Sequence, residues 1–243
     1  MNGLTAADFA DTGQWRLIIK IFKDGMTAHL ENTIRPEIEP QLMFSGNWNP
    51  AEEKLRENIE NAVYDHPRLL DDFATKIIIY DPNTLFIPTE LVEEEEGAEE
   101  KYHTTVFPCE ASDVMIDTDK DLTATYSMAP GVKSFLYRTF PGCRIHSNLM
   151  DKVKRFRNEG EGLRLYVTVR DVEFDLVLLD GESLISASTH KWKELTDVVY
   201  HGFNLLNVYE LDPMKTQFFI FGKEWPDNLK EFIQSKTKKL TLK

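Results

Sequence analysis

The 243-residue sequence contains only two cysteines, Cys109 and Cys143, and no Cys-x-x-Cys pair. Two isolated cysteines argue against a disulfide-stapled secreted scaffold and favour a reducing compartment. The N-terminal residues MNGLTAADFADTGQW have no basic segment followed by an apolar run, so they do not resemble a secretory signal. We therefore expect a cytoplasmic protein.

Long apolar runs and excess positive charge are missing as well. No stretch approaches the roughly 20 apolar residues that a membrane helix requires, so we expect no membrane insertion. The formal net charge is −13, which on average repels a phosphate backbone and argues against nucleic acid. One basic cluster keeps an RNA-associated role open, although we interpret it as a solvated helix face. It comprises Arg144, Lys152, Lys154, Arg155 and Arg157.

Familiar catalytic and metal-binding motifs are absent. None of the six histidines lies in an HExxH pattern or a tight Cys/His spacing, so a zinc site has no support. The Walker and Rossmann glycine patterns and the GxSxG motif are also missing. We interpret Cys143 as a small apolar residue, His201 as a packing or surface residue, and the acidic run 93–100 as a solvated helix or loop.

The first half of the chain shows hairpin and helix signals. Asp24-Gly25 between two apolar runs predicts a type I′ turn, in which both central residues have positive φ. Asn49 and Pro50 predict the start of a helix that ends near His66-Pro67. The expected strands are 15–23, 26–31, 41–45, 77–80, 85–87 and 122–128, and two further helices are expected at 132–140 and from 147 or 148 to 156.

The second half repeats this order. Strands are expected at 163–170, 173–179 and 183–189, and Asp180-Gly181 predicts a second hairpin. An apolar helix face runs from Leu195 to Leu206. The continuous apolar run 217–221 predicts a strand buried on both faces, and an amphipathic helix follows around 229–233.

The glycine-containing, charged segment 158–162 is the most linker-like part of the chain, so we predict two α/β lobes at 1–160 and 161–243. Each lobe opens with a three-stranded meander, followed by helix, strand and helix. Residues 1–13 are expected to form a flexible leader, and residues 93–120 an acidic insertion in the first lobe.

Three stretches carry a resemblance to a known family: IKIFKDGMTAHL (19–30), LFIPTELVEEEEGAEEKYHTTVFP (85–108) and SLISASTHKWKELTDVVYHGFNLLNVYELDPMKTQFFIFGK (183–223). They are similar to the uncharacterised Bacteroidetes family DUF3822. That family, and the doubled order of elements, resemble the actin-like ATPase superfamily with its two ribonuclease-H-like lobes. The resemblance implies mixed α/β sheets but no established activity.

The superfamily binds ATP between its lobes through two phosphate-binding hairpins and a glycine-rich adenosine loop. Glycines let backbone N–H groups approach phosphates, and acidic residues hold water around Mg²⁺. In the first hairpin, residues 23–27, the resemblance implies cofactor-facing positions at Lys23, Gly25 and Thr27. Only Gly25 matches, because Lys23 stands where an aspartate is usual and Asp24 falls at the turn.

The second hairpin and the adenosine loop depart further from the superfamily pattern. Thr168 stands where an aspartate is expected, and bulky residues replace the hairpin glycines. Gly222 is retained in the adenosine loop, but the next glycine is Lys223. The implied cofactor-facing residues here are Thr168, Arg170, Asp171, Gly222 and Lys223.

Because several elements of the site are altered together, we predict a non-catalytic scaffold that binds an unidentified protein partner and needs no cofactor. The alternative is an ATPase or kinase-like enzyme that binds ATP and Mg²⁺ in a divergent pocket. A homodimer is left open. Candidate binding surfaces are sheet edges, apolar helix faces and exposed tryptophans, although core positions are the preferred interpretation for Trp48, Trp192 and Trp225.

Overall fold

The computed structural model describes residues 11–50, 54–93 and 95–242. The chain forms two compact units, Met1–Asn148 and Leu149–Lys243. The sequence-based boundary at 160/161 differs because helix α4, Asn148–Arg157, packs on the strands that follow it. Residues 1–10 of the expected leader lie outside the described residues. Within the described residues, no helix is long and apolar enough to cross a bilayer.

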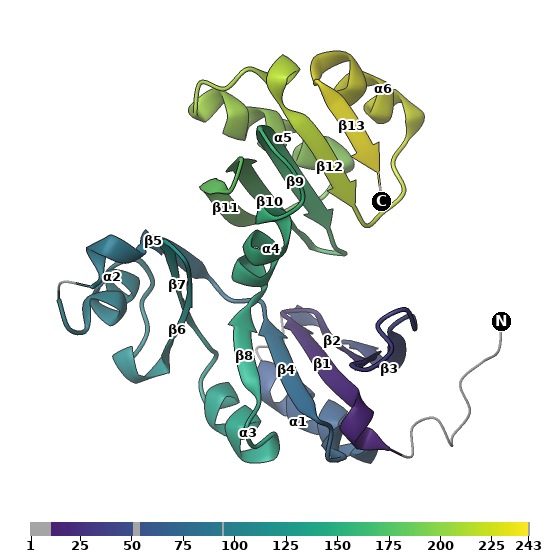
Figure 1. The fold of residues 1–243 in the computed structure, drawn as a ribbon, viewed down its shortest axis with the longest axis vertical. Helices are drawn as coiled ribbons and strands as arrows, with labels where there is room; N and C mark the ends of the chain where they lie inside the picture. The colour runs from purple at the N-terminus through teal and green to yellow at the C-terminus, as the bar shows by residue number, and fades with distance from the viewer. Residues whose placement is uncertain (1–10, 51–53, 94, 243) are drawn as a thin grey trace. The chain divides into compact units, whose positions relative to one another are not determined.

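The N-terminal unit is built on one mixed five-stranded sheet with the order β3-β2-β1-β4-β8 (Figure 1). Strands β1, β2 and β3 form the predicted antiparallel meander, and β4 and β8 extend it in parallel to β1. The elements are β1 (Trp15–Phe22), β2 (Gly25–Asn32), β3 (Gln41–Asn47), α1 (Leu55–Tyr64), β4 (Thr75–Tyr80), α3 (Val132–Thr139) and β8 (Arg144–Ser147).

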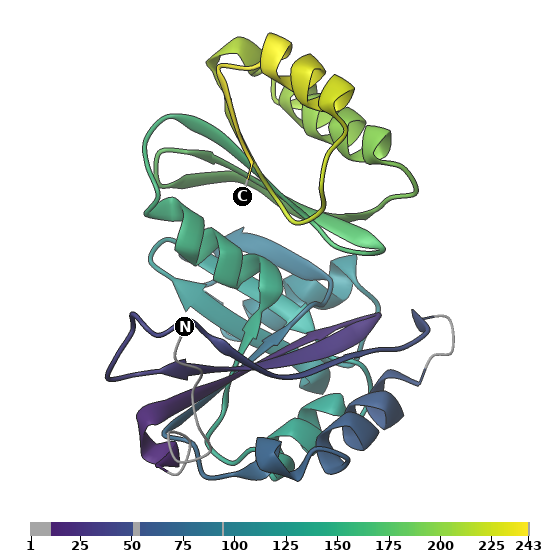
Figure 2. The same cartoon turned by 90° about the vertical axis from the view of Figure 1, so that its right-hand side faces the viewer.

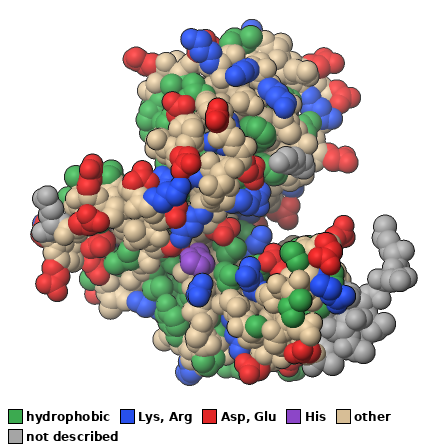
Figure 3. Space-filling model, in the orientation of Figure 1, with side chains coloured by type: hydrophobic (Ala, Val, Ile, Leu, Met, Phe, Trp, Pro, Cys, Tyr) green, Lys and Arg blue, Asp and Glu red, His purple; other side chains and the backbone are tan. Residues whose placement is uncertain are grey.

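A smaller sheet is inserted between β4 and α3, with the order β5-β7-β6. It contains β5 (Thr84–Pro88), α2 (Ala98–Val106), β6 (Val114–Asp119) and β7 (Leu122–Ser127). The inserted element is therefore longer than the acidic stretch 93–120. Acidic side chains gather over the α2 region on the face seen in Figure 3, as the run of glutamates leads one to expect.

The C-terminal unit repeats the arrangement of the first sheet. Its strand order is β11-β10-β9-β12-β13, so each of its strands has a counterpart in the order β3-β2-β1-β4-β8. The elements are β9 (Leu163–Val169), β10 (Glu173–Asp180), β11 (Ser183–Lys191), α5 (Leu195–Val208), β12 (Gln217–Phe221), α6 (Asp227–Lys236) and β13 (Lys239–Leu242). The topological repeat is confirmed, and two strands that the sequence analysis did not predict, β8 and β13, occupy equivalent edge positions.

Alternating burial explains why these segments form sheets. Every second residue of β1 is buried, and these residues pack with the apolar faces of α1 and α3 in one core. In the C-terminal unit, α5 and α6 cover one face of the sheet and α4 lies against the other (Figure 2). Phe156 of α4 stacks on Tyr166 of β9 with a centroid distance of 4.0 Å. Along β12, buried residues alternate with half-buried ones, and the half-buried Phe219 and Phe221 stack on Tyr166 and Phe156, so one face is covered fully and the other in part.

The two predicted hairpins exist, but their turns differ from type I′. Lys23 and Asp24 form the first turn, and neither these residues nor Gly25 has positive φ. In the second hairpin Asp180 pairs with Ser183, so the central residues are Gly181 and Glu182. Only Gly181, with φ of 56°, is in the left-handed region, as in type II′ turns. The type I′ prediction for the first turn was wrong because strand pairing continues to Gly25, whereas the hairpin predicted at Asp180-Gly181 is confirmed.

Candidate functional site

Lys23, Gly25 and Thr27 all lie on the β1–β2 hairpin, as expected. Trp48 caps its turn, since the indole Nε1 donates to the Lys23 carbonyl at 2.8 Å and the backbone N–H donates to the Asp24 carbonyl at 2.9 Å. A Cβ added to Gly25 would lie 2.7 Å from the Gly46 carbonyl oxygen. The close approach of β3 therefore explains why this position is a glycine, and no bound phosphate is needed to explain it. Thr27 lies within β2 and pairs with Lys20 and Ser45.

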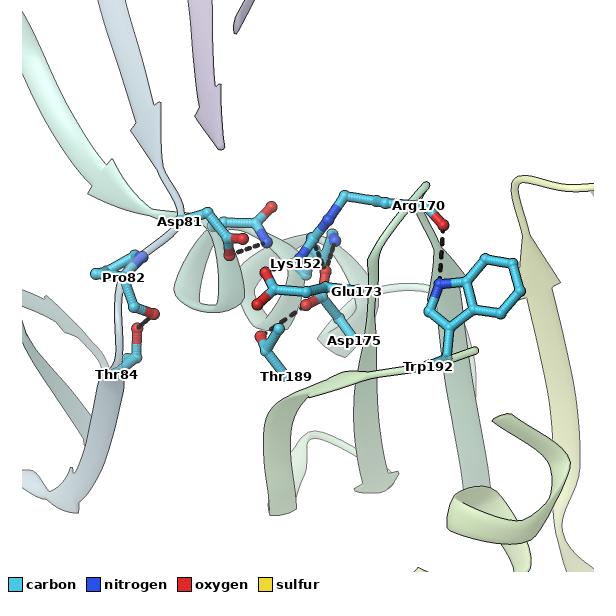
Figure 4. A network of polar contacts seen from close by, with 10 residues as sticks. Asp81, Pro82, Thr84, Lys152, Arg170, Glu173, Asp175, Thr189 and Trp192 are labelled. Atoms are coloured by element: carbon cyan, nitrogen blue, oxygen red, sulfur yellow. Dashed lines mark hydrogen bonds and ion pairs between the residues drawn. The ribbon is translucent and has the colours of Figure 1, made fainter. Parts of the chain in front are cut away.

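Arg170, Asp171 and Val172 connect β9 to β10. The Arg170 N–H donates to the Glu173 carbonyl at 2.9 Å, and the Arg170 carbonyl accepts from Trp192 Nε1 at 3.0 Å. The guanidinium turns back onto its own hairpin, where it contacts the Asp175 carboxylate and lies 3.6 Å from Glu173 (Figure 4). The Arg170 side chain is thus held by carboxylates of this chain.

Asp175 is the centre of this polar network. Its residue is 1% exposed, and its carboxylate contacts Lys152 from α4, contacts Arg170, and accepts from Thr189 Oγ1 at 2.7 Å. Burial alone would raise the pKa of Asp175, but the two neighbouring cations and the hydrogen bonds outweigh it and hold the pKa below its usual value. Asp175 is therefore a buried, ionised carboxylate with two cationic partners.

The adenosine-loop candidates lie in the same region of the C-terminal unit. Lys223 Nζ is 3.0 Å from Asp171 Oδ1 and 5.2 Å from the centroid of Trp192. Thr168 of β9 pairs with Asp175 of β10 and with Phe221 of β12. The structure thus brings together all five residues predicted in this unit, and their side-chain charges are paired with one another or with Asp175 and Glu173.

Gly222→Ala is expected to lower the free energy of unfolding by about 2–3 kcal/mol. Gly222 has φ of 106°, and an added Cβ would lie 2.2 Å from the Val169 carbonyl oxygen. Gly162→Ala is the matched control, because Gly162 has φ of 73° and nothing within 4 Å of its added Cβ. Denaturant unfolding should show that the free energy of unfolding falls by only about 1 kcal/mol in this control. Equal effects of the two substitutions would contradict the packing role of Gly222.

The sequence analysis missed several residues that the structure places at the sites. Lys152, Glu173 and Thr189 complete the network around Asp175. In the N-terminal unit, Asp81 follows β4, is 5% exposed, and accepts from Asn148 Nδ2 at 2.9 Å. Side chains that follow parallel strands gather at one edge of a sheet, so the position of Asp81 after the apolar run of β4 was a usable signal.

Two other reactive side chains singled out in the sequence, Cys143 and His201, lie in packed surroundings. Burial raises the pKa of the Cys143 thiol, which favours the protonated form. His201 stacks on His190 with a centroid distance of 4.6 Å and lies 5.6 Å from Phe174. In the described part of the chain, no three His, Cys, Asp or Glu residues are grouped so that they could hold a metal ion.

Two members of the basic cluster face the protein and not solvent. Lys152 contacts Asp175, and Arg157 is only 3% exposed. The interpretation of the whole cluster as a solvated helix face was therefore wrong for these two residues. The tryptophans follow the core interpretation: Trp225 is 5% exposed, and Trp48 and Trp192 are half-buried.

Comparison with known proteins identifies the family. A family model described as "Protein of unknown function (DUF3822)" matches residues 5–235. The chain belongs to this family. A comparison with curated proteins found no match.

Solved structures show the fold of this DUF3822 chain. A Bacteroides thetaiotaomicron protein "with actin-like ATPase fold and unknown function" is 18% identical, with a TM-score of 0.83 over 99% of this chain and 94% of that one. The "PilM-PilN type IV pilus biogenesis complex" contains a chain that is 11% identical, with a TM-score of 0.56 over 94% of this chain and 88% of that one. The family and the actin-like ATPase fold inferred from the sequence are confirmed.

Proposed function

We propose that this DUF3822 protein is a non-catalytic scaffold that binds a protein partner, and that its nucleotide site is degenerate. The contact between Arg170 and Asp175 is the observation that carries this proposal. A triphosphate with its metal carries several negative charges and requires unpaired donors around it. On the second hairpin, the Arg170 guanidinium is already bound to the carboxylates of Asp175 and Glu173.

Charge supports the same conclusion. Lys152 and Arg170 supply two positive charges, and Asp175 and Glu173 supply two negative ones. All four side chains are largely buried, so their mutual attraction is only weakly screened. A phosphate group would have to displace Asp175 and leave its carboxylate buried without its partners, which costs several kcal/mol.

The first hairpin, β1–β2, does not supply the metal-binding and phosphate-binding groups that the second hairpin lacks. Its position two before Gly25 is Lys23, which cannot hold water around Mg²⁺ as a carboxylate does. Gly25 serves the contact with β3, and Trp48 occupies both carbonyls of the turn. A cytoplasmic location fits the two free cysteines. A partner-binding role also fits the PilM neighbour, whose structure is that of a complex with PilN.

Millimolar ATP with Mg²⁺ is expected to leave the melting temperature of the full chain unchanged within about 1 °C. A ligand at about 100 times its dissociation constant would add about 2.7 kcal/mol and shift the transition by several degrees. Differential scanning fluorimetry measures this shift, with Mg²⁺ alone and ADP with Mg²⁺ as controls. A saturable rise with ATP, together with release of phosphate, would instead establish the divergent ATPase or kinase-like enzyme.

A further inference from the structure

Strand β3 is an edge of the N-terminal sheet and, among the described residues, pairs only with β2 (Figure 1). The Trp48 N–H donates to the Asp24 carbonyl, which fixes the alternation of hydrogen bonds along this antiparallel pair. With the register Gly25↔Asn47 and Thr27↔Ser45, the backbone N–H and C=O groups of Ser45 and Asn47 point away from β2. These groups can accept another strand.

A cavity of about 410 Å³ lies beside the other end of β3. Its walls include Leu30 and Met43 from the sheet and His66 and Leu69 from the segment after α1. Leu42, at its rim, is 60% exposed, although leucines are usually buried. We call this cavity, together with the outward-facing backbone of Ser45 and Asn47, the β3 groove.

The charge around the β3 groove restricts what it can bind. The described residues 31–50 and 54–72, which supply β3, α1 and the flanking loops, contain eight acidic and four basic side chains, a net charge of −4. Glu37, Glu39 and Asp65 are exposed, and the cavity is lined by Asp65 and by the exposed Arg68. A basic polypeptide is therefore attracted to this edge, whereas an acidic one is repelled.

We propose that the β3 groove binds an extended, basic segment of a partner protein, which adds a strand to β3 and places one bulky apolar side chain in the cavity. Backbone hydrogen bonds to Ser45 and Asn47 supply affinity, and the cavity and acidic surroundings supply selectivity. This inference rests on the proposed scaffold function and locates the partner surface on the N-terminal unit.

A phage-displayed library of random 12-residue peptides, selected on the full chain, tests the proposal. The enriched peptides are expected to contain Lys or Arg and a bulky apolar residue, with apolar residues at alternate positions. A synthetic peptide of this kind should slow amide hydrogen exchange at Ser45 and Asn47. Leu42→Asp should weaken its binding at least about tenfold, because it places a charge at the cavity rim.

Leu242→Asp is the matched control, because Leu242 is a 42% exposed leucine on the edge strand β13 of the other unit. It should leave peptide affinity unchanged. Peptides that bind equally well to Leu42→Asp, or a failure to enrich any peptide, would overturn the assignment of the β3 groove. If the protein forms a dimer that dissociates in Leu42→Asp, the groove binds a second copy of this chain. That result would overturn the proposal of a separate partner protein.

The nucleotide measurement separates this inference from the proposed function. Failed peptide binding without any ATP-induced shift overturns the β3 groove and leaves the non-catalytic assignment intact. Peptide binding at the groove combined with an ATP-induced shift supports the groove and overturns the degenerate nucleotide site.

Discussion

Asp175→Asn is expected to lower the free energy of unfolding at pH 7 by about 3–5 kcal/mol, as is typical when one partner of a buried ion pair is removed. Asparagine keeps the size of the side chain but removes its negative charge. Arg170 retains Glu173, 3.6 Å away, whereas Asp175 is the carboxylate that the Lys152 ammonium contacts. Denaturant unfolding followed by circular dichroism measures the loss.

Asp171→Asn provides the control for this substitution. It makes the same charge change on the same hairpin, but the Asp171 side chain is 70% exposed and its partner Lys223 is 41% exposed. Exposed pairs contribute less than about 1 kcal/mol. Adding Lys152→Met to Asp175→Asn should restore part of the stability, because the ammonium that has lost the Asp175 carboxylate is then removed. A similar loss for Asp175→Asn and Asp171→Asn would contradict the buried network.

The stability that Asp175 contributes should depend on pH, and the direction of its pKa shift fixes the direction of that dependence. The folded protein lowers the pKa of Asp175 below 3.8, so the unfolded state binds this proton more readily. The stability that the ionised carboxylate contributes is complete above about pH 5 and is lost as pH falls through and below 3.8. The difference between wild type and Asp175→Asn should therefore shrink in acid.

Local patterns were sufficient for most of the framework. The strand at Gln217–Phe221 was predicted with its observed bounds, because a short apolar run between Pro213 and Gly222 has few alternatives. Strand β6 was missed since its sequence, VMIDTD, has three apolar residues followed by three polar ones and shows no alternation. Asp117 is buried there because His146, 29 residues later in the chain, lies 3.0 Å from its carboxylate. Such a pairing leaves no periodic signal in the sequence.

The candidate site shows the same limit. The resemblance indicated which hairpins to inspect, and the five candidates in the C-terminal unit do lie together. It did not indicate that Arg170 turns back to Asp175, nor that Lys152 reaches the same carboxylate from α4. The first contact depends on the conformation of the β9–β10 connection and the second on how α4 packs on the sheet, and a sequence pattern specifies neither. Strand β13 was missed for a similar reason, since its four residues are a strand only through pairing with β12.

Arg164→Met is expected to lower the free energy of unfolding by about 3–5 kcal/mol, because it removes several hydrogen bonds that this buried guanidinium donates. Arg164 is 1% exposed. Its guanidinium donates to the Phe156 carbonyl at 3.0 Å and the Tyr166 hydroxyl at 2.9 Å, and it also contacts the Gly181 carbonyl. One side chain therefore joins the last turn of α4 to the β10–β11 turn across β9.

Arg155→Met and Arg164→Lys test whether hydrogen bonding by Arg164, and not positive charge alone, holds α4 in place. Arg155 is also close to α4's end but its side chain is 59% exposed, so its loss should cost less than about 1 kcal/mol. Arg164→Lys keeps the charge but lacks the planar fork that reaches several acceptors at once, so it should remain substantially destabilised. Hydrogen exchange of residues 163–180 gives the local readout. Full protection in Arg164→Lys would show that charge alone is sufficient.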